Sequence, residues 1–143
     1  MTPSHEFETR IAYADTDRMG VVYYANYFIL FERGRTELMR SMGLIYKDLE
    51  EKRRLFLPAV EASCRYLAPA HYDDLISIRT TISELGAASI AFSYDVVHGK
   101  TQKPLARGYT KHPFVDPSWK PVRVPADLRR LITPCVQPRP TGR

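Results

Sequence analysis

The chain has 143 residues, the size of one ordinary domain, and its 44% hydrophobic and 26% charged residues permit a packed core. It has no run of about 20 apolar residues that could cross a membrane, and its first residues lack the pattern of a secretory signal. We therefore expect a cytoplasmic protein without membrane insertion. The net charge of +5 includes no basic run or basic-aromatic motif typical of nucleic-acid binding. It indicates either a solvated surface or contact with an acidic or phosphorylated ligand.

The first part of the chain predicts one strand followed by one long helix. Phe7–Tyr13 is rich in β-forming residues and predicts a strand, and Asp15–Gly20 follows as a polar turn. From Ala25 to Met42, apolar residues recur at helical spacing, and Gly43 stands where a helix stop is expected. Gly34, in the middle of this helix, costs up to ~1 kcal/mol relative to Ala. A close approach of another backbone would justify that cost.

The rest of the chain predicts an antiparallel sheet. After a short helical connection over Leu44–Lys52, four segments rich in Val, Ile, Tyr, Phe and Thr predict strands: Leu57–Tyr66, Leu75–Leu85, Ala88–His98 and Leu105–Val115. Short turns join consecutive strands, so the sheet is antiparallel, and the long helix must cover one of its faces. Pro125–Leu131 predicts a short terminal helix. The sequence thus predicts one α+β domain over residues 1–132 and a loose Pro-rich C-terminal tail over residues 133–143.

Polar groups that can carry chemistry gather where the first strand meets the long helix. Asp15 and Asp17 flank Thr16 there, and a helix start presents unpaired N–H groups with partial positive charge. Such N–H groups can hold a developing oxyanion, and a carboxylate beside them can attack an acyl carbon or take a proton from water. An ordinary Asp is ionised at pH 7, as both roles require. Local spacing alone favours a simpler role, because Asp is a preferred N-cap.

The remaining polar residues predict structural roles. Two cysteines without a close pair, Cys64 and Cys135, give neither a disulfide framework nor a zinc site. Glu32 and Glu37 lie near Arg33 and Arg35 on the long helix, and they predict solvated helix pairs or interface contacts. His71 and His112 are expected to lie at the surface or to make hydrogen bonds, rather than to act as catalysts.

The segment from Tyr13 to Tyr27 carries a long motif, aromatic-X-Asp-(Thr/Cys)-Asp-X-X-Gly-(Val/Ile)-Val-(Tyr/Trp)-X-X-Asn-Tyr, and continues through Phe31–Glu37. This motif resembles the 4-hydroxybenzoyl-CoA thioesterase family of hotdog-fold enzymes, including the Tol–Pal-associated acyl-CoA thioesterases. A weaker resemblance runs through Arg65–Asp74 to Pro125, so nearly the whole domain is covered. The resemblance implies a hotdog fold, an antiparallel five-stranded sheet wrapped around one long helix.

The same resemblance implies an acyl-CoA thioesterase that hydrolyses a thioester to a carboxylic acid and free CoA. It places the catalytic carboxylate on Asp17, as nucleophile or general base, and the carbonyl-polarising backbone N–H on Tyr24. Some relatives carry His at the position of Tyr24, so a mechanism that needs an imidazole there is not expected. Asp15 receives no catalytic role and remains a predicted cap. Three further residues are expected to shape the helix start or the substrate pocket: Tyr23, Asn26 and Tyr27.

The resemblance also implies a homodimer or homotetramer with active sites between subunits, and no metal or redox cofactor. Three other functions stay open. The chain can be an acyl-carrier-protein thioesterase, since the +5 charge suits an acidic carrier as well as the phosphates of CoA. It can be a non-catalytic acyl-CoA binding protein. A hotdog hydratase is a more distant alternative, because that chemistry usually relies on a His with an acidic partner, a pair that the motif lacks.

Overall fold

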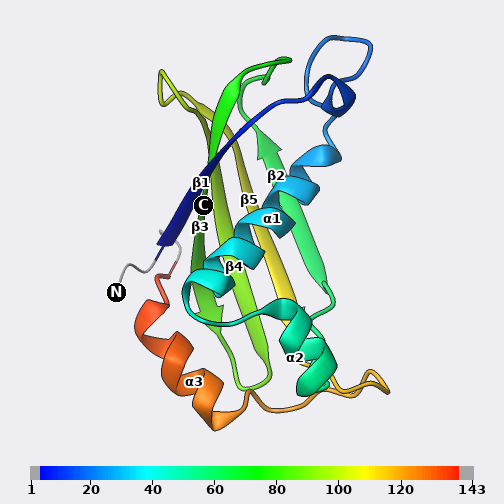
Figure 1. The fold of residues 1–143 in the computed structure, drawn as a ribbon, viewed down its shortest axis with the longest axis vertical. Helices are drawn as coiled ribbons and strands as arrows, with labels where there is room; N and C mark the ends of the chain where they lie inside the picture. The colour runs from blue at the N-terminus through cyan, green and yellow to red at the C-terminus, as the bar shows by residue number, and fades with distance from the viewer. Residues whose placement is uncertain (1–3, 139–143) are drawn as a thin grey trace.

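A five-stranded antiparallel sheet curves around one long helix in the computed structural model, which describes residues 4–138 (Figure 1). The strands are β1 (Ser4–Arg10), β2 (Glu61–Tyr66), β3 (Leu75–Leu85), β4 (Ser89–His98) and β5 (Pro104–Pro113). They lie in the order β1-β3-β4-β5-β2, and every neighbouring pair is antiparallel. The helices are α1 (Asn26–Ser41), α2 (Tyr46–Lys52) and α3 (Ala126–Ile132). The predicted α+β arrangement is confirmed.

Helix α1 packs on the sheet through the apolar stripe that its sequence predicts. Phe31 is fully buried, and its ring stacks on Tyr94 of β4 with the ring centroids 4.4 Å apart. Gly34 faces β3: a Cβ atom at this position would overlap Thr80 Oγ1 and come within 3.0 Å of Ile78 Cγ2. Gly34 thus makes a close contact with β3, but with the side chains of that strand and not with its backbone as expected.

Strand β1 is shifted toward the N-terminus relative to the predicted Phe7–Tyr13, and strand β2 is shorter than predicted. Strand β1 ends at Arg10, and Tyr13–Asp15 forms a 3-10 turn instead of continuing the strand. Strand β2 begins at Glu61 rather than Leu57. Pro58 lies in the lost part, and proline has no backbone N–H to donate to a sheet ladder.

The start of the C-terminal tail is held against the sheet, contrary to the expectation of a loose segment from residue 133. Thr133–Cys135 forms a 3-10 turn, and Cys135 is buried. Thr81 of β3 pairs with Ser4 of β1. The next residue of β3, Ile82, forms a parallel bridge with Val136 of the tail. The predicted tail extends further, but residues 139–143 lie outside the described part of the chain.

The helices outside the sheet cover one face and one end of it. The guanidinium of Arg53, at the end of α2, donates two hydrogen bonds of 2.7 and 2.9 Å to the Asp127 carboxylate of α3.

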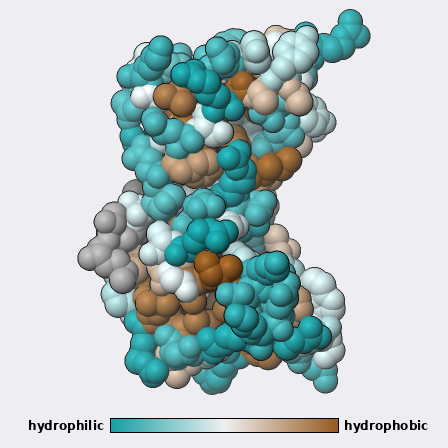
Figure 2. Space-filling view, viewed as in Figure 1, coloured by the Kyte–Doolittle hydropathy of each residue, from teal (hydrophilic) through white to brown (hydrophobic). Residues whose placement is uncertain are grey.

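On the face that carries α1, most of the surface is hydrophilic, with separate hydrophobic patches (Figure 2). Within residues 4–138, no helix is both long and apolar enough to span a bilayer.

Candidate functional site

Asp17 lies in a tight turn between β1 and α1. The Asp17 N–H donates to the carbonyl of Val21 at 2.9 Å, and the Gly20 N–H donates to the carbonyl of Asp17 at 2.9 Å. Gly20 has a φ of +80°, a conformation that glycine adopts without steric cost. The carboxylate Oδ1 of Asp17 accepts the N–H of Met19 at 2.8 Å. The turn thus fixes one carboxylate oxygen, while no donor from residues 4–138 reaches the other.

Tyr24 stands just before α1 with its backbone N–H unused. The Tyr23 N–H donates to the Asp15 carbonyl at 3.0 Å and the Asn26 N–H to the Tyr23 carbonyl at 2.9 Å, whereas the Ala25 N–H between them has no acceptor within residues 4–138. The Tyr24 N–H has no acceptor within residues 4–138. The Tyr24 carbonyl accepts the hydroxyl of Tyr66 at 2.8 Å, so the end of β2 holds the next peptide group in place.

An open groove of about 340 Å³ brings Asp17 and Tyr24 together. Its lining is mostly apolar and aromatic: Asp17, Met19, Val21, Val22, Tyr24, Tyr27, Tyr66, Leu67, Ala68 and Pro69. Asp17 is the only charged residue of this lining. A concave, largely apolar surface with one carboxylate and one free N–H is suited to bind an apolar group and act on its polar end.

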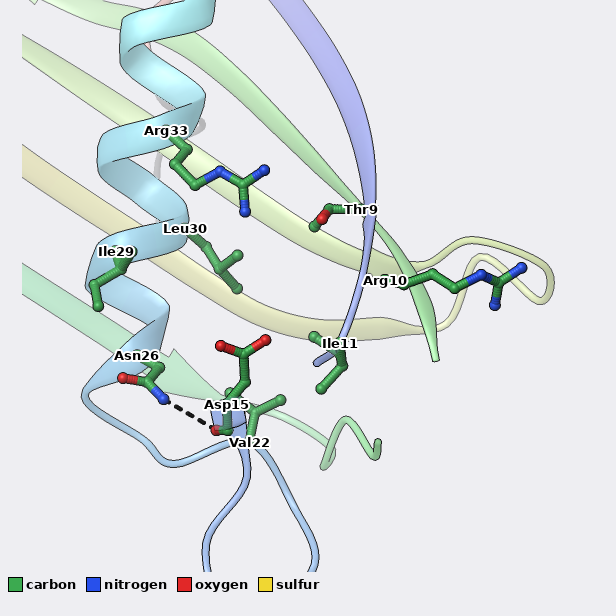
Figure 3. A pocket seen from close by; sticks show the side chains of 9 residues that line it. All are labelled: Thr9, Arg10, Ile11, Asp15, Val22, Asn26, Ile29, Leu30 and Arg33. Carbon is green, nitrogen blue, oxygen red and sulfur yellow. Dashed lines mark hydrogen bonds between the residues drawn. The ribbon is translucent and has the colours of Figure 1, made fainter. Parts of the chain in front are cut away.

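The other predicted site residues divide between two places. Tyr27 is buried and lines the groove, where its ring meets that of Tyr66 at 5.2 Å, and burial raises the pKa of its hydroxyl. Tyr23 does not line the groove; its exposed ring lies 4.8 Å from that of Tyr24. The Asn26 side chain donates to the Asp15 carbonyl at 3.0 Å and holds the helix start (Figure 3). Substrate binding by Tyr23 and Asn26 stays a prediction.

Asp15 is a cap, as predicted, and the element that it caps is a turn and not the start of α1. Its carboxylate Oδ2 accepts the backbone N–H of Ala12 at 2.8 Å, at the start of the 3-10 turn and not at α1. Figure 3 shows the Asp15 carboxylate pointing into the space between β1 and α1, where a cavity of only about 50 Å³ lies. The two aspartates of the motif therefore face different surroundings.

Sequence reasoning did not assign a role to Tyr66–Pro69, the part of the groove that comes from the end of β2. Partial burial raises the pKa of Tyr66 to about 12, so its hydroxyl remains a donor to Tyr24 at neutral pH. The weaker resemblance over Arg65–Asp74 was a signal for this segment. It could not show which of these side chains face the groove, because that depends on the pairing of β2 with β5.

Within residues 4–138, no three His, Cys, Asp or Glu side chains converge as metal ligands would.

Comparison with known proteins places the whole domain in one family. The model of the thioesterase-like superfamily matches residues 11–132. The putative acyl-CoA thioesterase YneP of Bacillus subtilis is 32% identical over 117 residues, which are 81% of this chain and 83% of that protein. The acyl-CoA thioesterase YbgC of Haemophilus influenzae is 33% identical over 124 residues, covering 86% and 90%.

A solved structure shows the same fold. The crystal structure of a 1,4-dihydroxy-2-naphthoyl-CoA thioesterase from Synechocystis matches with a TM-score of 0.84 and 26% identity, and the match covers 91% of this chain and 96% of that one. The sheet wrapped around α1 is therefore the hotdog fold that the Tyr13–Tyr27 motif implied. The chain belongs to the thioesterase-like superfamily of hotdog-fold enzymes.

Proposed function

We propose that this protein hydrolyses an acyl-CoA thioester, with Asp17 as nucleophile or general base and the Tyr24 backbone N–H as the donor to the thioester carbonyl. One observation carries the proposal: Asp17 and Tyr24 line the same groove, and the Tyr24 N–H has no acceptor within residues 4–138. The names of the similar proteins, among them two acyl-CoA thioesterases, support the substrate class.

The groove offers the two groups that thioester hydrolysis requires. As general base, Asp17 takes a proton from water while the water oxygen bonds to the thioester carbon. The carbonyl oxygen then carries negative charge, which the Tyr24 N–H stabilises. Collapse of this intermediate breaks the C–S bond, and the CoA thiolate takes up a proton as it leaves. The proton that Asp17 took from water passes to the thiolate, so Asp17 returns to its carboxylate form, and the acid product keeps the second proton of the water.

Asp17 can also attack the carbonyl itself. Its free carboxylate oxygen then forms a mixed anhydride as the thiolate leaves, and water hydrolyses the anhydride in a second step. Both routes use the same oxyanion donor and the same carboxylate. The hydrogen bond from Met19 to Oδ1 leaves the second oxygen of Asp17 available for either role.

Thiol release from a panel of short, long and aromatic acyl-CoA substrates tests the proposal. We expect hydrolysis of at least one class by the wild type. We expect Asp17→Asn to lower kcat by about 10²- to 10⁴-fold, the usual contribution of a positioned acid or base. KM is expected to change little, since the amide has the same shape as the carboxylate and can still accept the Met19 N–H.

Asp15→Asn is the matched control, because Asp15 caps the 3-10 turn and an Asn oxygen can accept the same N–H from Ala12. It should retain activity within a few-fold. Equal rates for Asp17→Asn and wild type would remove Asp17 from the mechanism. Thioester binding without thiol release on the whole panel would instead identify a non-catalytic acyl-CoA binding protein.

The net charge of +5 is also compatible with a second candidate, a thioesterase that acts on acyl carrier protein. An acidic carrier and the phosphates of CoA would both be attracted by this charge. Hydrolysis of the same acyl group on CoA and on carrier protein separates the two functions, because the acyl groove is common to both and only the carrier differs. The carrier that gives the higher kcat/KM is the preferred substrate of the protein.

A further inference from the structure

Arg35 turns toward the interior instead of forming the solvated ion pair that its position on α1 predicted. Among the charged residues nearby, Arg40 pairs with Glu37 at 3.6 Å, and Glu32 accepts the Thr36 hydroxyl at 3.2 Å. Arg35 instead donates to the Tyr94 hydroxyl at 3.4 Å. It makes no ion pair with a carboxylate of residues 4–138, although its Nε is buried. A buried cation without a counter-charge is unfavourable.

The side chains that follow Arg35 form a neutral hydrogen-bonded chain. The Tyr94 hydroxyl lies 2.6 Å from Thr110 Oγ1, which lies 2.8 Å from His112 Nε2, and His112 Nδ1 lies 3.3 Å from the Leu57 carbonyl. Burial and the charge of Arg35 lower the pKa of His112 to about 4, so the ring is neutral at pH 7. Nδ1 must then hold the single proton, because the Leu57 carbonyl can only accept.

The directions of the other hydrogen bonds follow from that tautomer. His112 Nε2 accepts from Thr110, Thr110 accepts from Tyr94, and Tyr94 accepts from Arg35. Every donor in the chain points away from Arg35. The network therefore orders the guanidinium but supplies no negative charge to it.

A cavity of about 430 Å³ adjoins Arg35, between α1 and α2. Two polar atoms of its lining residues, Arg35 Nε and the Tyr46 hydroxyl, are buried and make no hydrogen bond of normal geometry within residues 4–138, although the two side chains lie close enough for the Arg35 charge to act on the Tyr46 hydroxyl. Buried polar groups are normally paired, so an unpaired donor on each of two facing elements calls for an acceptor between them. Ile45 and Leu57 provide apolar surface beside these donors.

The charges around the cavity restrict the acceptor. Arg35, Arg40 and Lys47 line it together with Glu32 and Glu50, so positive charges outnumber negative ones by one. That balance suits one negative charge and disfavours the two charges of a phosphate near the glutamates. A carboxylate matches the planar guanidinium fork and can also accept a hydroxyl hydrogen bond.

We propose that the cavity between α1 and α2 binds a monoanionic carboxylate with a short apolar body, held by Arg35 and the Tyr46 hydroxyl. The ligand class includes the acids that thioester hydrolysis releases, but the site does not depend on Asp17, which lines the groove at the other end of α1. Carboxylate binding and thioester hydrolysis can therefore succeed or fail separately.

Isothermal titration calorimetry of the full chain with sodium hexanoate tests the site. We expect hexanoate to bind, and hexanol and inorganic phosphate to bind at least about tenfold more weakly, because the first lacks the charge and the second carries too much. Tyr46→Phe should weaken hexanoate binding about tenfold through loss of one hydrogen bond to a charged acceptor. Arg35→Gln should remove binding, since it removes the positive charge.

Tyr46→Phe also has a structural readout. Since the hydroxyl makes no hydrogen bond of normal geometry within residues 4–138, its removal should leave the melting temperature of the ligand-free protein unchanged or raised. Asp17→Asn should bind hexanoate as the wild type does. Equal binding of hexanol, undiminished binding by Tyr46→Phe, loss of binding in Asp17→Asn, or a Tyr46→Phe protein that melts several degrees lower would each overturn the proposal.

Discussion

Individual buried polar side chains of this protein are held in one protonation state by their neighbours, and His112 is the clearest case. The ring is fully buried against Phe92, where ring centroids lie 5.6 Å apart, and it bonds Thr110 and Leu57. Protonation would force Nε2 to donate to Thr110, and this reverses the order of the chain that ends at Arg35. The neutral state of one imidazole thus fixes the direction of several hydrogen bonds.

Stability should consequently fall in mild acid. The pKa of His112 is about 4 in the folded protein against 6.5 as its ordinary value, so the unfolded chain binds more protons between these two values. The stabilisation is fully present above pH 6.5 and is lost as the pH falls toward 4. The lowered pKa of His112 corresponds to on the order of 3 kcal/mol of unfolding free energy. Urea unfolding between pH 4 and 7 measures it.

His112→Gln serves as the comparison, because glutamine makes hydrogen bonds but does not titrate. The variant should be less stable at pH 7 and should show a flatter dependence of unfolding free energy on pH. An identical slope in the variant and the wild type would assign the acid sensitivity to other groups.

At the scale of elements, the distance between α1 and β3 is set by a residue without a side chain. Gly34 lies against Thr80 Oγ1 and Ile78 Cγ2, and both of these residues are fully buried. Replacement by alanine would add up to ~1 kcal/mol of helix propensity. It would also push α1 away from the sheet.

Gly34→Ala is expected to be destabilising overall, by about 1–3 kcal/mol, because overpacking against the sheet outweighs the gain in propensity. Urea unfolding of the variant checks the sign. In a Thr80→Ala background the same change should cost less, since the overlapping hydroxyl is gone and two residues in contact do not act additively. An equal cost in both backgrounds would place the strain elsewhere.

For the molecule as a whole, the main feature is that one edge of β2 has no neighbouring strand within the described sheet. β2 is an outer strand of the sheet, and all its side chains except that of Cys64 are exposed. Exposed strand edges invite pairing with another chain. Tyr66, the last residue of β2, and the following Leu67–Pro69 line the Asp17 groove, so a second copy paired along β2 would lie beside that groove. This arrangement fits the expectation of active sites between subunits.

We expect the protein to form a homodimer that Ala62→Pro disrupts. The Leu67 N–H donates to Leu105 of β5 at 2.9 Å, and the same register pairs Ser63 with Tyr109, so the alternation along the strand turns the N–H of Ala62 outward, away from β5. Proline at position 62 therefore blocks pairing with a second chain but spares the bonds to β5. Sedimentation equilibrium should give a dimer for the wild type and for Ala62→Ser, and a monomer for Ala62→Pro. A monomeric wild type would refute the assembly.

Sequence alone was enough to predict the long helix, the strand-rich second half and the Asp17 turn, because these depend on residues close together in the chain. Helical spacing and Gly43 located α1 within one residue at each end, and the Tyr13–Tyr27 motif placed Asp17 and Tyr24 beside the helix start. Local spacing also suggested a cap at Asp15, but the capped element could be seen only once β1 ended at Arg10.

Three features could be seen only in the folded protein: the far wall of the groove, the inward turn of Arg35 and the packing of Val136 on β3. The Tyr66 hydroxyl reaches the Tyr24 carbonyl across 42 positions of sequence, and Arg35 reaches Tyr94 across 59. Contacts of this kind are set by strand pairing and by the position of α1 on the sheet. Local propensity and periodicity report the neighbours within a few residues, so they carry no information about which distant side chains will meet.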